Sequence, residues 1–306
     1  MSKIPAPLTA GACIGITAPA GFMALERISS CIDTLQEWGF TVRLGDTTHS
    51  NSSNYFSDAD EERRIDLQRL LDDPEVDAIL CARGGYGTSR IIDRLDFTAF
   101  RRKPKWIIGF SDVTVLHSHI WMEYGIATLH APMAAAFNPD GPGYATLASL
   151  KAALEGQPSR YSVAAHPFNR LGHAKGTLVG GNLALLTHCI GTPSELKTKK
   201  TILFLEDVGE YLYSIDRMLV QLKRSGKLAR LAGLVVGGFT GMKDTERPFG
   251  RDAYEIIRDA VSKYDYPVCY DFPVSHADRN MALKHGVQHT LDVESDEVRL
   301  EERVKK

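Results

Sequence analysis

The stretch WIIGFSDVTVLHSHIWMEYGIATL, residues 106–129, carries the clearest fold signal in the chain. It starts with the apolar run Trp106 to Phe110, continues with a helix expected over roughly Val113 to Tyr124, and returns to an apolar run at Ile126 to Leu129. A strand, a helix and a strand in this order favour a right-handed crossover between parallel strands.

The same alternation runs through the first half of the chain. Further strands are expected at Cys13 to Thr17, Phe40 to Leu44 and Val76 to Ala82, and further helices at Leu25 to Trp38, from near Ser57 to the residue before Pro74, and at Ser89 to Leu95. We therefore expect a flavodoxin-like parallel sheet whose ligand site lies beyond the carboxyl ends of its strands.

The pattern weakens between Phe137 and His173, where prolines and glycines gather at 138–143 and 156–158. We place a domain boundary near residue 170, so that an N-terminal α/β domain covers 1–165 and a C-terminal mixed α/β domain covers 170–306. The second half has expected strands at Thr201 to Glu206, Gly233 to Phe239 and Pro267 to Asp271, helices near Ser214 to Lys223 and Asp252 to Tyr264, and a closing hairpin at Gln288 to Val293 and Val298 to Glu301.

Length and composition favour two domains and argue against several classes of function. The 306 residues are 43% hydrophobic, and the formal net charge of −2 gives no basic excess for nucleic acid. The N-terminus lacks the apolar core of a secretory signal, and no run approaches the length of a membrane span. The five cysteines are scattered, as is usual in a reducing cytoplasm. We expect a cytoplasmic protein with no nucleic-acid or membrane partner.

Ser111 follows the apolar run of the opening stretch and precedes its helix. A serine at such a turn is well placed for a nucleophile, because the N-terminus of the helix favours developing negative charge. Serine is also a common helix N-cap, so this segment alone is compatible with a structural role. The turn further departs from the Gly-x-Ser-x-Gly elbow, since Val113 replaces the second glycine.

A glycine-rich turn, Arg83-Gly84-Gly85-Tyr86-Gly87, follows the strand Val76 to Ala82. Glycines let backbone amides face a ligand, so Gly84 and Gly85 are candidates for an oxyanion site. A plain turn or a phosphate loop would have the same composition, although the spacing matches neither common nucleotide motif.

Glu206 ends one predicted strand of the second half, and His276 follows another. A carboxylate directly after a buried strand needs a partner, and a histidine is suitable. Glu206 could instead cap a turn or pair with Arg217, and His285 and His289 compete with His276 as the base. If Ser111, His276 and Glu206 converge, they form a nucleophile, a base and an orienting carboxylate.

Five motifs in order resemble the LD-carboxypeptidase family of serine peptidases across nearly the whole chain. They are Arg83 to Gly87, Gly109-Phe110-Ser111-Asp112, Gly180-Gly181-Asn182-Leu183, Leu205-Glu206-Asp207 with Ile215 to Leu219, and Phe272 to His276. Two departures are Ser275, where the family usually has glycine, and Tyr211 to Ser214 in place of a Pro-Tyr-Arg type run.

The resemblance implies a cytoplasmic, homodimeric enzyme that needs no cofactor. The residues themselves predict no metal site, because His119 and Glu123 form a single i, i+4 pair without a third ligand. It implies cleavage of the meso-diaminopimelate–D-Ala bond of muropeptide tetrapeptides in peptidoglycan recycling, with Ser111 as nucleophile, His276 as base and Glu206 as its carboxylate. The backbone amides of Asp112 and of the Gly84-Gly85 turn would form the oxyanion hole, and Arg83 is the nearest candidate for binding the C-terminal carboxylate of the substrate.

Three other functions stay open at the level of sequence. A sister branch of the same family hydrolyses the amide of microcin C-type antibiotics. An α/β-hydrolase esterase or amidase has the same order of serine, acid and histidine. A non-catalytic protein could bind an anionic small molecule at the glycine turn, with Ser111 as a cap.

Overall fold

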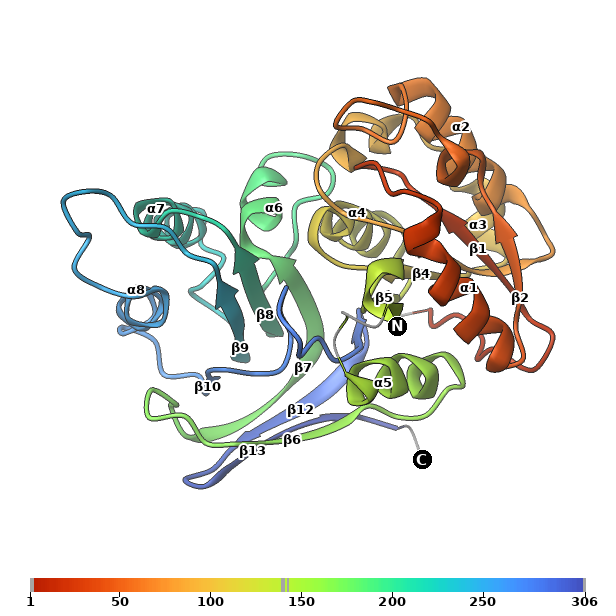
Figure 1. Ribbon diagram of the computed structural model, residues 1–306. Coiled ribbons are helices and arrows are strands. Elements are labelled where there is room, and N and C mark those ends of the chain that lie inside the picture. The colour runs from red at the N-terminus through yellow and green to blue at the C-terminus, as the bar shows by residue number, and fades with distance from the viewer. Residues whose placement is uncertain (1–2, 139–140, 142, 305–306) are drawn as a thin grey trace.

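The computed structural model describes residues 3–138, 141 and 143–304 and contains two sheets (Figure 1). The first sheet has the order β11-β5-β4-β3-β1-β2, parallel except for β11. Its strands are β1 Cys13–Thr17, β2 Thr41–Leu44, β3 Val76–Cys81, β4 Trp106–Gly109, β5 Thr128–His130 and β11 Leu283–His285. The predicted parallel sheet is confirmed, with strand ends shifted by one or two residues.

Helices cover both faces of this sheet. The helix α1 (Glu26–Glu37) packs with the face that contains Trp106 and Ile108, whereas α2 (Asp60–Asp72), α3 (Thr98–Arg102) and α4 (Thr114–Tyr124) pack on the face that contains Ile107. The helix expected at Ser89 to Leu95 is wrong: two 3-10 turns, Thr88–Arg90 and Ile92–Arg94, occupy this segment, and α3 follows them.

The second sheet has the order β10-β9-β8-β7-β12-β13-β6 and is mixed. Its strands are β6 Arg160–Ala164, β7 Gly172–Asn182, β8 Thr201–Val208, β9 Gly233–Thr240, β10 Val268–Cys269, β12 Gln288–Val293 and β13 Glu297–Glu302. The helices α6 (Leu183–His188), α7 (Leu212–Arg224) and α8 (Ala253–Ala260) pack on one face of β7, β8 and β9. The predicted combination of helices and strands in the C-terminal half and its closing hairpin are therefore confirmed.

Several elements after residue 143 were not expected from the sequence. These are α5 (Tyr144–Leu154), β6, β7, α6 and β11. The strand β7 contains four glycines, and β6 alternates between exposed and half-buried residues, so neither has the continuous apolar run that marked the other strands.

The two sheets exchange strands across the expected boundary. The strand β6 pairs with β13 in the second sheet, and β11 pairs antiparallel with β5 in the first. The division at residues 165 and 170 stays a prediction; Pro139, Asp140 and Pro142 of the proline- and glycine-rich stretch lie outside the described residues. Because β11 closes the first sheet, the segment just before it, residues 270–282, is held between the two sheets.

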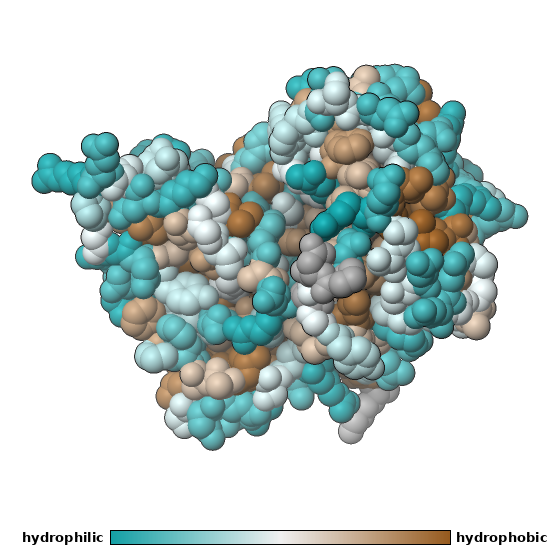
Figure 2. Space-filling view, viewed as in Figure 1, coloured by the Kyte–Doolittle hydropathy of each residue, from teal (hydrophilic) through white to brown (hydrophobic). Residues whose placement is uncertain are grey.

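The outer surface is mostly polar. The face in Figure 2 is mainly hydrophilic, and its hydrophobic residues form small separate areas. Within the part of the chain that the structure describes, no helix combines the length and the apolar character needed to cross a bilayer.

Three fully buried histidines lie where β5, β11 and α4 meet. The His117 ring Nε2 donates to the backbone oxygen of Gly109 at 2.8 Å, and the His117 and His285 rings stack at 5.9 Å. The rings of His117 and His130 lie 6.3 Å apart. Burial lowers the pKa of His117 to about 4 and that of His130 and His285 well below the usual value. All three are therefore neutral in the folded protein.

We predict that acid destabilises the protein through these side chains. The unfolded chain takes up protons on them below a pKa of about 6.5, so the free energy of unfolding decreases as the pH falls from about 6.5 towards 4. Each histidine contributes up to about 1.4 kcal/mol per pH unit. Urea unfolding over this range should show a shallower pH dependence for His285→Phe than for the wild type, while replacement of the exposed His49 by Gln changes nothing. An unchanged slope in His285→Phe would contradict this origin.

Candidate active site

Ser111 lies two residues after the end of β4, at the carboxyl edge of the first sheet. Its φ is +60°, a left-handed conformation that costs a non-glycine residue about 1–2 kcal/mol. The following 3-10 turn and α4 have Phe110 and Val113 at their N-cap positions, and neither has a side-chain cap. Ser111 is therefore not a helix cap, and the strained backbone turns its side chain away from the strand, as in a nucleophile elbow.

The glycine turn approaches Ser111 closely. A Cβ atom at Gly84 would lie 2.9 Å from the Ser111 Cβ, 3.0 Å from its Oγ and 3.3 Å from the backbone nitrogen of Asp112. Only glycine fits at residue 84 without a shift of these atoms. Gly85 has a φ of +101° and is exposed. The predicted neighbours Gly84, Ser111 and Asp112 are thus brought together.

Arg63, which the sequence did not indicate as a site residue, holds the end of this glycine turn in place. Its fully buried guanidinium donates to the backbone oxygens of Pro19 and Gly87 and pairs with Asp60. Asp112 makes a second contact with this segment: its buried carboxylate accepts a hydrogen bond from the backbone N–H of Thr88 at 2.8 Å. Burial raises the pKa of Asp112. Arg63 and Asp112 thus bond to neighbouring backbone groups, of Gly87 and Thr88, at the end of the turn.

Glu206 is fully buried at an irregularity of β8. The register between β8 and β9 shifts between Leu205 and Asp207, which is how a bulge redirects a side chain. The Glu206 Oε2 lies 2.6 Å from Nδ1 of His276. Since a carboxylate only accepts, the imidazole donates through Nδ1–H, and a neutral ring keeps Nε2 free to take a proton.

His276 faces the Ser111 turn. Its ring lies 4.7 Å from the ring of Phe110, the neighbour of Ser111, and its Nε2 is buried without a hydrogen-bond partner among the described residues. The sequence alternatives are located elsewhere: His285 belongs to the buried cluster, and the His289 Nδ1 donates to the Val287 oxygen at 3.1 Å. Of the three histidines considered, His276 is the one bonded to Glu206.

Ser275, the departure from the family pattern, closes the loop that carries His276. Its hydroxyl donates to the backbone oxygen of Arg279 at 3.0 Å and accepts from the N–H of Ala277 at 3.0 Å. On the other side, a Cβ at Gly238 would come within 2.5 Å of the Ser275 Cβ. The loop therefore lies directly on β9.

Asn182 at the end of β7 is bonded to Asp207, the neighbour of Glu206 in β8, a contact that the sequence did not indicate. The Asn182 carboxamide donates to Asp207 at 2.9 Å, and its backbone N–H donates to the Thr114 hydroxyl of α4 at 3.2 Å. Burial and the adjacent Glu206 raise the pKa of Asp207 to about 6. The Gly180-Gly181-Asn182 motif thus joins the two halves, because Gly181 leaves no room for a side chain against Thr114.

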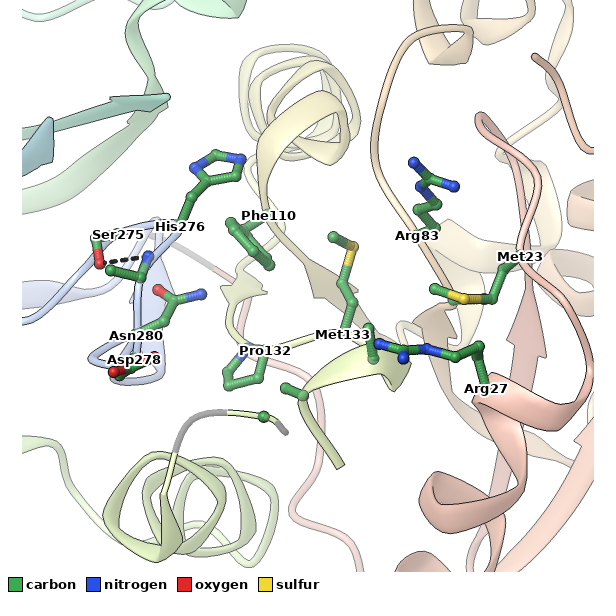
Figure 3. A pocket seen from close by; sticks show the side chains of 15 residues that line it. Met23, Arg27, Arg83, Phe110, Pro132, Met133, Ser275, His276, Asp278 and Asn280 are labelled. Carbon is green, nitrogen blue, oxygen red and sulfur yellow. Dashed lines mark hydrogen bonds between the residues drawn. The ribbon is translucent and has the colours of Figure 1, made fainter. Parts of the chain in front are cut away.

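A cavity of about 280 Å³ opens beside His276 (Figure 3). Phe110, Pro132 and Met133 lie between the His276 loop on one side and Arg83, Met23 and Arg27 on the other. Its lining residues are Met23, Arg27, Ala82, Arg83, Phe110, Pro132, Met133, Ala135, Ala136, Gly141, Ser275, His276, Ala277, Asp278 and Asn280. The predicted Arg83 is exposed here and donates to the Phe22 oxygen at 2.7 Å.

Residues 14–131 match the model of the LD-carboxypeptidase N-terminal domain, and residues 175–291 match that of the C-terminal domain. A probable murein peptide carboxypeptidase of Bacillus subtilis is 35% identical over 94% of this chain and 91% of its own length. The chain belongs to the LD-carboxypeptidase family. The murein tetrapeptide carboxypeptidase of Pseudomonas aeruginosa is 29% identical, with 91% and 92% covered. The crystal structure of muramoyltetrapeptide carboxypeptidase from Oxalobacter formigenes superposes with a TM-score of 0.86 at 28% identity, covering 95% of this chain and 99% of that one.

Family membership makes the chain a peptidase of the carboxypeptidase type, so the non-catalytic binding protein is no longer needed as an explanation. The alternative role considered for Glu206, an ion pair with Arg217, is wrong, because Glu206 is bonded to His276. Arg217 donates to the Ser214 hydroxyl and lies over the Tyr213 ring. Over the described ranges, no three His, Cys, Asp or Glu side chains are grouped as metal ligands.

We predict that steric pressure between β9 and the His276 loop controls activity. Gly238→Ala should lower the carboxypeptidase rate at least tenfold, because its methyl group would push Ser275 away and move His276 off Glu206. Ser275→Gly alone should lose a few-fold, since it removes the two hydroxyl contacts.

The double variant Gly238→Ala/Ser275→Gly provides the decisive comparison. Without the Ser275 side chain, the atom nearest to the new methyl group is the Thr240 Cγ2 at 3.6 Å, an ordinary van der Waals contact. Its rate should recover towards that of Ser275→Gly alone. A double variant as slow as Gly238→Ala would refute the steric explanation, and melting temperatures identify variants that are merely unfolded.

Proposed function

We propose that this enzyme removes the terminal D-alanine from muropeptide tetrapeptides by cutting the meso-diaminopimelate–D-Ala bond, a step of peptidoglycan recycling. The observation that supports it most is the bond between Glu206 and His276 beside the Ser111 turn, in a chain of the LD-carboxypeptidase family. The murein names of its relatives favour this substrate class.

The proposed reaction is an acyl transfer in two steps. His276 Nε2 takes the proton of the Ser111 hydroxyl as its oxygen attacks the scissile carbonyl, and Glu206 stabilises the imidazolium that forms. His276 then gives this proton to the departing amine. Water attacks the resulting ester on Ser111 with the same help from His276, which releases the shortened peptide.

The oxyanion of the tetrahedral intermediate needs donors that are in place beforehand. We assign this role to the backbone N–H groups of Asp112 and of the Gly84-Gly85 turn. The close packing of Gly84 on Ser111 and the ties of Arg63 and Asp112 to this turn support the assignment, because they fix the donors before substrate binds.

Cytoplasmic location and homodimerisation, which the family resemblance implies, belong to the same proposal. Light scattering of the purified protein tests homodimerisation. A mass of one chain at micromolar concentration would contradict a homodimer.

The decisive substitution is Ser111→Ala. It removes the attacking oxygen, so release of D-alanine from a muropeptide tetrapeptide should fall by at least about a thousandfold while the fold is kept. D-alanine can be quantified by coupled oxidation, and circular dichroism checks the fold. Ser118→Ala in α4 is the matched control, because the buried Ser118 hydroxyl has no partner among the described side chains and backbone groups.

Two outcomes would overturn the proposal. Unchanged release in Ser111→Ala would reject this nucleophile. A wild-type enzyme that releases no D-alanine but cleaves an aminoacyl nucleotide amide would show that the microcin C-type hydrolase is the better description.

A further inference from the structure

The second sheet ends in a strand whose outer edge is open. The strand β6 pairs with β13 on one side, and no described strand pairs with its other side. Both strands lie at the lower border of the molecule (Figure 1). An unpaired edge of this kind presents backbone donors and acceptors with which another strand can pair.

The pairing with β13 shows which backbone groups of β6 are free. The N–H of Glu302 donates to the oxygen of Ser159, and the N–H of Ala165 donates to the oxygen of Asp296. Because hydrogen-bonded pairs alternate along an antiparallel ladder, the odd-numbered residues of this segment direct their backbone groups towards β13. The N–H and C=O groups of the even-numbered residues, 160, 162 and 164, therefore point outwards.

Two copies of this edge are complementary when they run antiparallel about Ser162. Ser162 then lies opposite Ser162 of the second copy, and Arg160 lies opposite its Ala164, so that the outward backbone groups of both strands pair. The close, non-hydrogen-bonded pairs of this ladder join Tyr161 to Val163 of the second copy. An aromatic ring beside a β-branched side chain is a favourable cross-strand pair. It occurs twice, because the contact has two-fold symmetry.

Pairing in this register also extends the hydrophobic core from one copy to the other. Tyr161 and Val163 are half-buried at the margin of the core cluster that contains Val298 and Leu300 of β13. Within one chain, Leu300 pairs with Tyr161 and Val298 pairs with Val163. A continuous apolar row then crosses the contact, made of Leu300 and Tyr161 of one copy and Val163 and Val298 of the other. The two half-buried side chains become buried in both copies, which is favourable.

The charges on the other face of β6 match as well. Arg160 is exposed on this face, and Glu297 of β13 pairs with Ala164 on the same face. In the antiparallel register, Glu297 of the second copy lies two strand spacings from Arg160, about 10 Å, with only the small Ala164 between them. Glu297 also pairs with Arg299 of its own chain at 2.9 Å, but a carboxylate can accept several hydrogen bonds. Two ion pairs between the copies therefore fit the contact.

We propose that two copies of this chain join through their β6 strands, antiparallel about Ser162, so that their seven-stranded sheets form one continuous sheet. The inference rests on the homodimer within the proposed function and names the surface that forms it. Both copies use the same strand, as in an isologous contact. The contact lies apart from the active site, because β12 and β13 separate β6 from β7.

The first experiment removes an outward hydrogen bond without touching the pairing with β13. Ser162→Pro lacks the N–H that binds the second copy, whereas Ser162→Ala keeps it, and both variants lose the hydroxyl. Light scattering over a concentration series should show dimerisation weakened at least about a hundredfold by Ser162→Pro and at most about threefold by Ser162→Ala. Circular dichroism and the rate of D-alanine release per chain check that both variants are folded.

The outcomes separate this inference from the proposed function. A dimer that is weakened equally by Ser162→Pro and Ser162→Ala overturns the β6 contact and leaves the proposed function intact. A wild type that remains a single chain at micromolar concentration contradicts the homodimer of the proposed function and this inference with it. The carboxypeptidase activity itself is tested separately by Ser111→Ala.

The second experiment reverses charges in separate chains. Arg160→Glu alone brings two carboxylates together across the contact, and Glu297→Arg alone brings two guanidinium groups together, so each variant should dimerise more weakly than the wild type. Mixing the two variants restores opposite charges at both ends of the contact. Heterodimers should then form with an affinity within about tenfold of that of the wild type. Light scattering that shows no heterodimer in the mixture would refute the assigned register.

The third experiment tests the register by cross-linking. The Cα atoms of residue 162 in the two copies should lie about 5.5 Å apart, which suits a disulfide. Under mild oxidation, Ser162→Cys should form covalent dimers, whereas Ala164→Cys should not, because residue 164 lies opposite residue 160 of the other copy. The wild type, whose cysteines are buried or half-buried, is the blank. Equal cross-linking in the two variants, or none in Ser162→Cys, contradicts the proposal.

Discussion

The hydrogen bond between Glu206 and His276 is the contact on which the whole site depends. Its two residues come from a bulge in β8 and from the segment before β11, 70 positions apart in the chain. Glu206 is fully buried, and a buried carboxylate without a partner would cost several kcal/mol. The fold therefore has to keep His276 in place for its own stability.

Glycines make this arrangement possible because three backbone segments approach one another closely. Gly84 packs on Ser111, Gly181 packs on Thr114 at the start of α4, and Gly238 packs on Ser275. Each contact joins a different pair of elements around the site. Ser275 shows that the loop accommodates a side chain where the family resemblance predicts glycine, and its hydroxyl hydrogen-bonds two backbone groups.

The sequence predicted the parallel sheet well because its strands are continuous apolar runs between clear helix signals. It predicted less of the second half, where β7 contains glycines and β11 has three residues that belong to the other sheet. Ser111, Glu206 and His276 could be selected as candidates, since each lies at or just after the end of a predicted strand. Arg63 could not, because its partners come from distant segments and no local pattern marks it. Asn182 and Asp207 lie in motifs of the family resemblance, but nothing local shows that they bond to each other.

The buried histidines next to the site leave polar atoms without hydrogen bonds at the junction of the two halves. His117, His130 and His285 are fully buried, and five of their six ring nitrogens lack a partner among the described residues. Neutral imidazoles tolerate such burial far better than carboxylates or ammonium groups do. Asn280 continues this polar cluster to the cavity wall, beside His276. Because a well-packed apolar junction would be more stable, the polar character of this region is best explained by the site that it borders.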